Sequence, residues 1–287
     1  MKTYNKSIGT VLFTVITLVL LAGSLAQADD VYVSCMVGGT IAKIDSSGNV
    51  STFASGFNQP KGIAFDNSGY LYVANTGINS IEKVDSSGNW TTFASDLVTP
   101  QDLAFAIDSG GNLFAGNYYD DSITKFDAAG NGTFFASIGR PQGLAFDSSG
   151  YLYAASYYSG AITKFNSSGS GSFFASGGYS IVGLAFDASD NLFAANYYDG
   201  TITKYDTSGN GTIFASGLNY PHGLAFDSSG SLYATVSGAI YKFNSSGNMS
   251  IFASGLDTPT FIATQIPEPA TLLLLGLGAA MVSRKRR

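Results

Sequence analysis

The sequence predicts an all-β fold, a six-bladed β-propeller with four strands in each blade. The first observation is a repeated cassette, best seen in residues 143–177, GLAFDSSGYLYAASYYSGAITKFNSSGSGSFFASG. It holds four short apolar runs separated by loops rich in Ser, Gly, Asp, Asn and Tyr. Runs of this length between turn-forming residues are typical of strands, because helices usually need about ten residues or more.

The number of cassettes is the second observation. The Phe-Ala-Ser of the last strand recurs at spacings of 40, 42, 39, 40 and 38 residues, at Phe53, Phe93, Phe135, Phe174, Phe214 and Phe252. A lysine of the third strand recurs in step, at Lys43, Lys83, Lys125, Lys164, Lys204 and Lys242. Self-similarity near 40 residues with four strands per unit is typical of propeller blades, so six units predict six blades.

The first strand of the cassette predicts how the ring closes. GLAF-type copies begin at five positions, Gly62, Asp102, Gly143, Gly183 and Gly223. The sixth copy is the degenerate segment 261–264, whereas the body opens on a second strand at 31–33. We therefore expect the C-terminal strand to complete the N-terminal blade in a three-plus-one closure, which leaves no open sheet edge.

Residues 1–28 have the pattern of a secretory signal peptide with an apolar helix. Lys2 and Lys6 precede an apolar stretch over 8–22, and Ala26-Gln27-Ala28 fits a small-x-small cleavage site. We expect signal peptidase to cleave after Ala28; the alternative is a retained membrane anchor. The pattern predicts export in either case.

The composition fits an exported protein that does not bind nucleic acid. Six of the 14 basic residues and one of the 20 acidic residues, Glu268, lie in the terminal segments, so eight basic and 19 acidic residues remain in the body, whose net charge is −11. Nucleic-acid binders carry basic patches instead. The single cysteine, Cys35, cannot form an internal disulfide, and its apolar strand favours burial over an intermolecular bond.

Residues 29–265 form one predicted domain without a charged or proline-rich linker. Its first and second strands are apolar on both faces, as expected for sheets packed between neighbouring blades. Glycines of the first strand suit a crowded axis. The turns of the type Asp-Ser-Ser-Gly-Asn predict side-chain caps with a glycine at positive φ. A calcium loop is the alternative for this motif, which lacks the spaced carboxylates of such loops.

The C-terminal segment, residues 266–287, has three parts. Pro267-Glu268-Pro269 precedes an apolar run over 270–282, predicted as a short helix, and the chain ends in Arg284-Lys285-Arg286-Arg287. Thirteen apolar residues are short for a full membrane span, but the basic end would hold such a segment with its terminus in the cytoplasm. An ordinary tail anchor is one interpretation.

All three parts closely resemble the PEP-CTERM sorting signal. This resemblance implies processing by exosortase at Pro267, Glu268 and Pro269 in a Gram-negative bacterium, with delivery to the cell surface or extracellular matrix. Both terminal segments would engage the inner membrane transiently. The body in turn resembles NHL-repeat propellers in Pro221-His222-Gly223-Leu224-Ala225 and in Ile202-x-Lys204-x-Asp206, a likeness that covers the whole body and implies fold rather than function.

Tyrosines mark one rim of the predicted ring as a candidate binding surface. The turns after the first and third strands share one rim and are nearly identical from blade to blade, whereas the loops after the second and fourth strands share the other and vary. The varied rim carries eight of the 17 tyrosines: Tyr118, Tyr119, Tyr157, Tyr158, Tyr197, Tyr198, Tyr179 and Tyr220. Such rings suit sugars or peptides. Packing between blades is the alternative, chiefly for the first of each Tyr-Tyr pair.

A second candidate site is the central pocket. The crossovers bring one residue per blade to the axis, Lys61, Gln101, Gln142, Val182, His222 and Thr260. The ends of the second strands add Asn75, Asn117 and Asn196. Related lactonases use a glutamate with Asn and Asp ligands, and related lyases use histidines. This chain offers only Glu82, Glu268 and one histidine, and a divalent ion on the three asparagines would lack a charged ligand. We therefore expect no metal, cofactor or catalytic group.

These observations favour a non-catalytic, exported binding module for exopolysaccharide or another matrix component. One alternative is a hydrolase or lyase of lactonase type that acts at the central pocket. The other is a purely structural matrix protein that binds no ligand.

Overall fold

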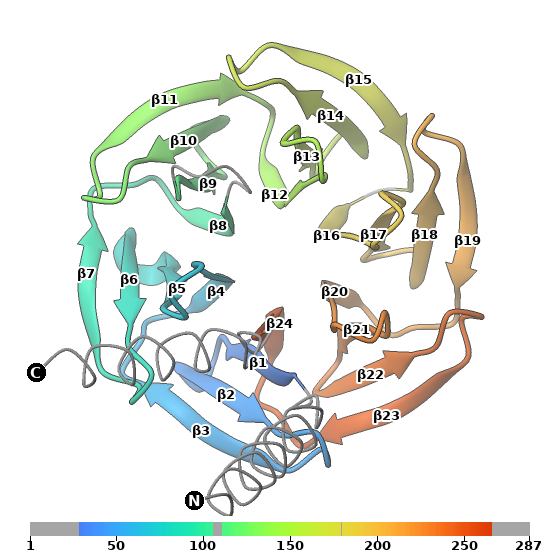
Figure 1. Cartoon of the computed structure of the whole chain (residues 1–287), viewed down its shortest axis with the longest axis horizontal. Helices are drawn as coiled ribbons and strands as arrows, with labels where there is room; N and C mark the ends of the chain where they lie inside the picture. The colour runs from blue at the N-terminus through green and yellow to red at the C-terminus, as the bar shows by residue number, and fades with distance from the viewer. Residues whose placement is uncertain (1–28, 106–110, 179, 266–287) are drawn as a thin grey trace, which may run out of the picture. The chain divides into compact units, whose positions relative to one another are not determined.

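The computed structural model describes residues 29–105, 111–178 and 180–265, and these form a ring of six four-stranded antiparallel sheets (Figure 1). The predicted six-bladed propeller is confirmed. The predicted signal helix and C-terminal helix, the processing residues Ala28, Pro267, Glu268 and Pro269, and the rim residue Tyr179 lie outside the described residues. Within the described residues, no helix is long and apolar enough to cross a membrane.

Each blade consists of strands A to D, counted outward from the axis. The A strands are β4 (Pro60–Phe65), β8 (Pro100–Phe105), β12 (Pro141–Phe146), β16 (Ile181–Phe186), β20 (Pro221–Phe226) and β24 (Pro259–Gln265). The B strands are β1 (Asp30–Cys35), β5 (Leu71–Asn75), β9 (Leu113–Asn117), β13 (Leu152–Ser156), β17 (Leu192–Asn196) and β21 (Leu232–Val236). The A strands surround the axis in Figure 1, and the B strands are almost completely buried.

The outer half of each blade is more exposed. The C strands are β2 (Thr40–Ile44), β6 (Ser80–Val84), β10 (Ser122–Phe126), β14 (Ala161–Phe165), β18 (Thr201–Tyr205) and β22 (Ala239–Phe243). The D strands are β3 (Val50–Ser55), β7 (Trp90–Ala94), β11 (Gly132–Ser137), β15 (Gly171–Ser176), β19 (Gly211–Ala215) and β23 (Met249–Ser254). A single 3₁₀ turn among the described residues, η1 (Thr76–Ile78), lies between β5 and β6.

The ring closes as the sequence predicts. Blade 1 has the strand order β24-β1-β2-β3, and β24 pairs antiparallel with β1, with Val31 opposite Thr264 and Val33 opposite Ile262. Side chains reinforce the join, since the Ser34 and Thr260 hydroxyl oxygens lie 2.9 Å apart. Every strand finds its partners within residues 29–265, so the body closes without either terminal segment.

Aromatic rings join neighbouring blades in a repeated way. The ring of a B-strand residue meets a D-strand phenylalanine of its own blade and an A-strand phenylalanine of the next, as Tyr153 meets Phe174 and Phe186 at 4.9 Å between centroids. The same edge-to-face arrangement recurs around Tyr32, Tyr72, Phe114 and Phe193. Such contacts add to the burial of apolar area, which makes blade-on-blade packing the main source of stability.

The recurring strand-C lysines have a structural role. In five blades each pairs with an aspartate at the start of strand B or in the turn before it, as Lys164 does with Asp147 at 3.2 Å. The same ammonium lies over the ring of Tyr153, 5.0 Å from its centroid. Burial raises the pKa of Asp227, but hydrogen bonds and the charge of Lys242 outweigh it and hold that pKa below its usual value. These lysines therefore belong to the scaffold.

The predicted turn caps are also present. Asp45 accepts hydrogen bonds from the backbone N–H groups of Ser47 and Asn49, at 2.9 and 3.0 Å, and Gly48 has a φ of 84°. The prediction that Cys35 is buried is confirmed, because only 3% of it is exposed. Burial raises the pKa of its thiol, which makes it a poor nucleophile.

Candidate binding site

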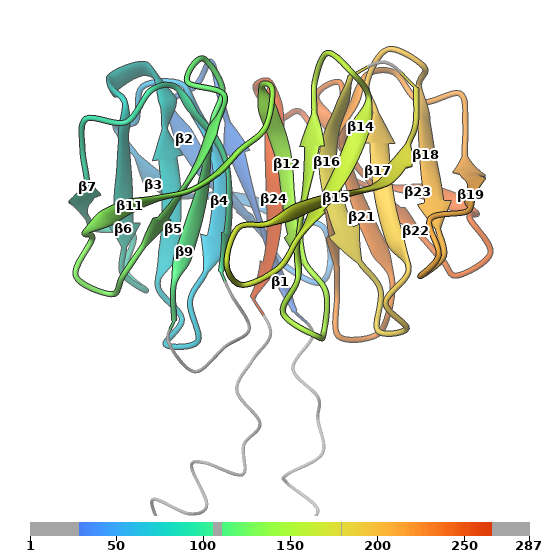
Figure 2. The same cartoon turned by 90° about the horizontal axis from the view of Figure 1, so that it is seen from above.

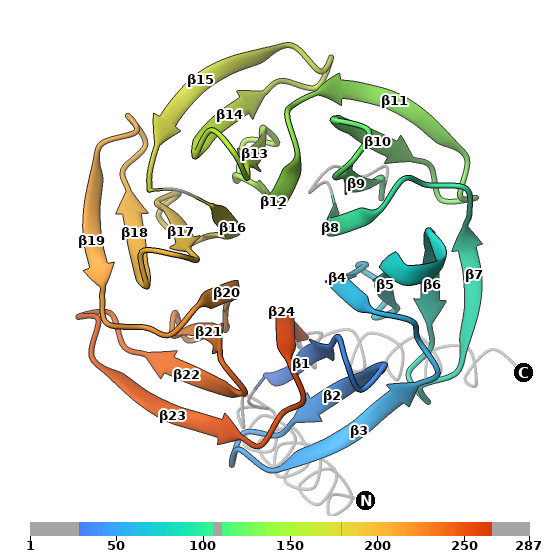
Figure 3. The same cartoon turned by 180° about the vertical axis from the view of Figure 1, so that it is seen from behind.

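The variable loops meet on one rim of the ring, as predicted. The crossovers that enter each blade donate to or accept from the loops between strands B and C, for example Leu97 N–H to the Asn79 carbonyl and Tyr197 N–H to the Ser180 carbonyl. Figure 2 shows the strands running between two rims, and Figure 3 views the rim on which η1 lies. We call this the tyrosine rim.

The paired tyrosines of this rim divide into two kinds. The first of each pair, Tyr118, Tyr157 or Tyr197, is half-buried, whereas Tyr119, Tyr158 and Tyr198 are 68, 59 and 61% exposed. The pairs also connect across blades. The Tyr157 and Tyr198 hydroxyls lie 3.1 Å apart, and the Tyr118 and Tyr157 rings meet at 5.9 Å. The first tyrosines therefore hold the loops together while the second ones face solvent.

Arg140 lies among these rings, and the sequence reasoning missed it. Its guanidinium carbon lies 4.1 Å from the centroid of the Tyr158 ring and 5.1 Å from that of Tyr118. It donates hydrogen bonds to the hydroxyls of both tyrosines. Asp121 accepts from the Arg140 backbone N–H at 2.8 Å and so fixes the crossover that carries it. The rim therefore presents a cation between aromatic faces.

A cavity of about 310 Å³ opens at the axis beneath this rim. Residues of both predicted sets line it: Lys61, Gln142, His222, Tyr157, Tyr197, Tyr198 and Tyr220. Val182 and Thr260, two further crossover residues, also line it. The sequence analysis treated the tyrosine rim and the central pocket as separate sites. In the structure the two overlap: four rim tyrosines line the axial cavity, whereas Tyr118, Tyr119 and Tyr158 are not among its lining residues. The cavity lies at the lower end of the usual size of ligand pockets.

The polar side chains that line this cavity differ in whether they have hydrogen-bond partners. The Lys61 ammonium donates to the Gln101 side-chain oxygen at 2.8 Å, and burial lowers the pKa of Lys61. Gln142 Oε1 and His222 Nδ1 are buried, and neither has a hydrogen-bond partner in the part of the chain that the structure describes. Buried polar atoms are normally paired, so unpaired ones that line a cavity are candidates to bind a ligand.

His222 is neutral at physiological pH. Burial is the main cause that lowers its pKa from 6.5 to about 3; the charge of Lys61 adds to this, and a hydrogen bond with the Thr260 backbone opposes it. Its ring contacts Phe261 at 4.7 Å between centroids. A side chain with this pKa is a poor general base at pH 7 but a good neutral hydrogen-bonding group.

The three asparagines are not in the axial cavity, which corrects their predicted placement. Each ends a B strand, one strand out from the axis, and hydrogen bonds either within its own blade or to the crossover that enters that blade. Asn75 accepts from the Asn58 N–H at 2.7 Å, and Asn196 donates to two threonine hydroxyls at 2.8 and 2.9 Å. These contacts fix the crossover into blade 2 and join strand B to strand C in blades 3 and 5.

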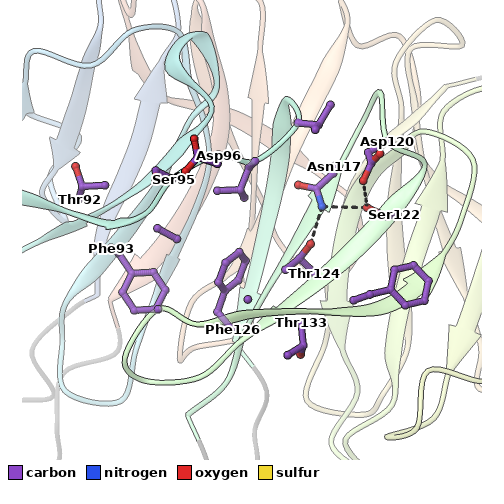
Figure 4. Close-up of a pocket in the computed structure, with 16 residues that line it drawn as sticks. Thr92, Phe93, Ser95, Asp96, Asn117, Asp120, Ser122, Thr124, Phe126 and Thr133 are labelled. Carbon is purple, nitrogen blue, oxygen red and sulfur yellow. Dashed lines mark hydrogen bonds between the residues drawn. The ribbon is translucent and has the colours of Figure 1, made fainter.

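Asn117 lines a different cavity, of about 690 Å³, between blades 2 and 3. Figure 4 shows its amide nitrogen pointing to the hydroxyls of Ser122 and Thr124, at 3.1 and 2.9 Å. Asp120, also on its wall, accepts from the Ser122 hydroxyl at 3.1 Å. None of the described residues that line it is a lysine, arginine or histidine, so its electrostatic character is opposite to that of the axial cavity.

Two buried carboxyl groups serve the scaffold. Asp102, in strand β8, accepts from the N–H groups of Leu103 and Leu144, at 2.9 and 2.8 Å, and so joins blades 3 and 4; burial raises its pKa to about 8. Glu82 lies inside blade 2, where it accepts from Ser80 at 2.5 Å. Across residues 29–105, 111–178 and 180–265, no three His, Cys, Asp or Glu side chains are grouped so as to hold a metal ion.

The chain's C-terminal segment is a PEP-CTERM protein-sorting motif, matched over residues 265–287. The predicted sorting signal is thereby confirmed. The motif implies export, membrane-associated sorting through the C-terminus and processing by exosortase. A search of curated proteins found no match.

The solved structures that resemble the body include propellers of the NHL- and gluconolactonase-like class. It is similar to a structure of a nidogen/laminin complex, with a TM-score of 0.75, 19% identity and coverage of 82% of this chain and 98% of that chain. It is also similar to a streptogramin B lyase, with a TM-score of 0.64, 14% identity and coverage of 83% of this chain and 87% of that chain. A third similar structure is a gluconolactonase from Xanthomonas campestris, with a TM-score of 0.66, 17% identity and coverage of 79% of this chain and 87% of that chain. Identities this low establish the fold alone.

Proposed function

We propose that the protein is a non-catalytic binding module of the cell surface or extracellular matrix, and that it binds polysaccharide in the axial cavity and along the tyrosine rim. The observation that carries this proposal is the overlap of the two: four rim tyrosines, Tyr157, Tyr197, Tyr198 and Tyr220, line a cavity whose other lining residues include Gln142 and His222, each with an unpaired buried polar atom among the described residues. Aromatic faces pack against the C–H faces of sugar rings, and polar atoms can bind sugar hydroxyls.

The two ends of the body lie on the rim opposite the proposed binding surface. Asp30 and Gln265 are paired at the ends of β1 and β24, on the rim opposite the tyrosines. The sorting motif begins at residue 265. A protein attached through that end would keep its point of attachment away from the proposed binding rim.

Replacing the three exposed tyrosines tests this proposal. The body, residues 29–265, would be co-sedimented with the exopolysaccharide of its own bacterium. A Tyr119/Tyr158/Tyr198→Ala variant should bind at least about tenfold more weakly, because each lost aromatic contact contributes about 0.5–1.5 kcal/mol. The control is a Tyr70/Tyr151→Ala variant. It removes the same kind of side chain, but these two tyrosines lie on the opposite rim, where they are 40 and 39% exposed.

The outcomes separate the three functions considered. Binding that is lost only in the rim variant supports the proposal. Equal binding by all variants places the site elsewhere, and absence of binding by the native body favours a structural role. A hydrolase or lyase would instead show turnover that is lost in a His222→Ala variant.

A further inference from the structure

The distribution of basic residues singles out two cations. Of the eight in the body, five strand-C lysines are paired with aspartates, and Lys125 occupies the same strand-C position, over the Phe114 ring. Lys61 and Arg140 remain. Within the described part of the chain, neither side chain has a carboxylate within salt-bridge distance. Both lie toward the tyrosine rim of a body whose net charge is negative.

The surroundings of Lys61 lack a negative charge. Its ammonium has a neutral partner, Gln101 Oε1, and among the described residues no aspartate or glutamate lines the axial cavity. Removing an ammonium from water without a counter-ion is unfavourable, and burial accordingly lowers the pKa of Lys61. An anion that entered the cavity would supply the missing partner and reverse this effect.

On the basis of the polysaccharide binding proposed above, we propose that the axial cavity selects the carboxylate of an acidic sugar, a uronic acid, and that Lys61 binds its charge. A single ammonium matches a single negative charge. Gln142 and neutral His222 offer hydrogen bonds to the sugar hydroxyls beside it, and the tyrosines offer faces for its ring.

Arg140 extends the match from one sugar to a polymer. It lies on the rim between Tyr118 and Tyr158, and Tyr157, the neighbour of Tyr158, lines the cavity. A planar guanidinium pairs well with a carboxylate and stacks on aromatic rings. A chain of uronic acids could therefore place one carboxylate in the cavity and another at the rim.

The net charge of the body opposes this ligand at long range. At −11, it repels a polyanion in dilute buffer, and Asp121 lies close to Arg140 on the rim. Salt at physiological strength limits such fields to about 8 Å, whereas contacts inside the cavity are screened less. The binding measurement therefore belongs at about 0.15 M salt.

The test compares two probes that differ only at one group of each sugar, a carboxylate in the first and a neutral hydroxymethyl group in the second. Isothermal titration would measure binding of the body to a tetramer of α-1,4-linked galacturonate and to the same tetramer after reduction of its carboxyl groups. The native body should bind the acidic tetramer at least tenfold more tightly. A Lys61→Gln variant should lose this preference. A Lys164→Gln variant, which changes the net charge equally but removes a scaffold lysine, should keep it.

Each outcome bears on one of the two proposals. Equal affinity of the native body for both tetramers overturns the selection of a carboxylate and leaves polysaccharide binding in place. A preference that survives in Lys61→Gln overturns the role of Lys61. Failure to bind either tetramer overturns the uronic acid as ligand, while co-sedimentation with the native exopolysaccharide decides the wider proposal separately. A thermal unfolding curve confirms that each variant is folded.

Discussion

Removing residues 259–265, and with them strand β24, should abolish the cooperative unfolding of the body. This strand provides the innermost strand of blade 1, and it buries Phe261 and Ile262 to 4 and 6% exposure. Burial of two such side chains contributes about 1.5–3 kcal/mol each, and each lost hydrogen bond with β1 costs about 0.5–1.5 kcal/mol more. Together these losses approach the whole stability of a typical domain, about 5–15 kcal/mol.

Urea unfolding followed by circular dichroism checks this expectation. A chain of residues 29–258 should show no sharp transition and should expose the unpaired edge of β1. The chain of residues 29–265 is the reference, because it keeps all strand partners. A cooperative transition of the shorter chain at nearly the same urea concentration would mean that closure contributes little.

The second large effect is expected for Gly183→Ala, at the axis. A Cβ atom added at Gly183 would lie 2.1 Å from the His222 carbonyl oxygen, in the neighbouring A strand. Backbone atoms cannot move aside as a flexible side chain can, so blades 5 and 6 would have to separate. We expect a loss of at least about 3 kcal/mol in the free energy of unfolding.

Gly139→Ala provides the matched control for this change. Its added Cβ would meet Ser156 Oγ at 3.8 Å, an ordinary contact, and Gly139 is not among the residues with positive φ. Its effect should remain within about 0.5 kcal/mol. Similar losses for both variants, measured by the same urea titration, would show that the close approach at Gly183 does not determine stability.

The fold was predictable because its signals repeat. The Phe-Ala-Ser and lysine series give the number of blades, and the missing first strand at the N-terminus identifies segment 261–264 as its completion. The role of the lysines was not predictable from spacing, because Lys164 and Asp147 meet only through the register of strands A, B and C. A repeated residue can mark either a scaffold or a site until its partner is known.

The candidate site was predictable only in part. Because alternate connections of a blade share a rim, the tyrosines could be placed on one rim. The same reasoning put Asn75, Asn117 and Asn196 at the axis, although they bond to strand C or to a crossover instead. The error arises because strand B lies one strand away from the axis. Arg140 escaped notice since it belongs to no motif, and its partners Tyr118 and Tyr158 come from two different blades.

Footprinting of the tyrosines tests the central claim most directly, because it needs no substitution. The body would be labelled by hydroxyl radicals with and without its exopolysaccharide, and the labelling of each tyrosine would be measured by mass spectrometry. We expect protection of Tyr119, Tyr158 and Tyr198, while Tyr70 and Tyr151 on the opposite rim keep their reactivity. Protection of the opposite rim alone, or unchanged labelling of the tyrosine rim in the bound state, would contradict the proposed site.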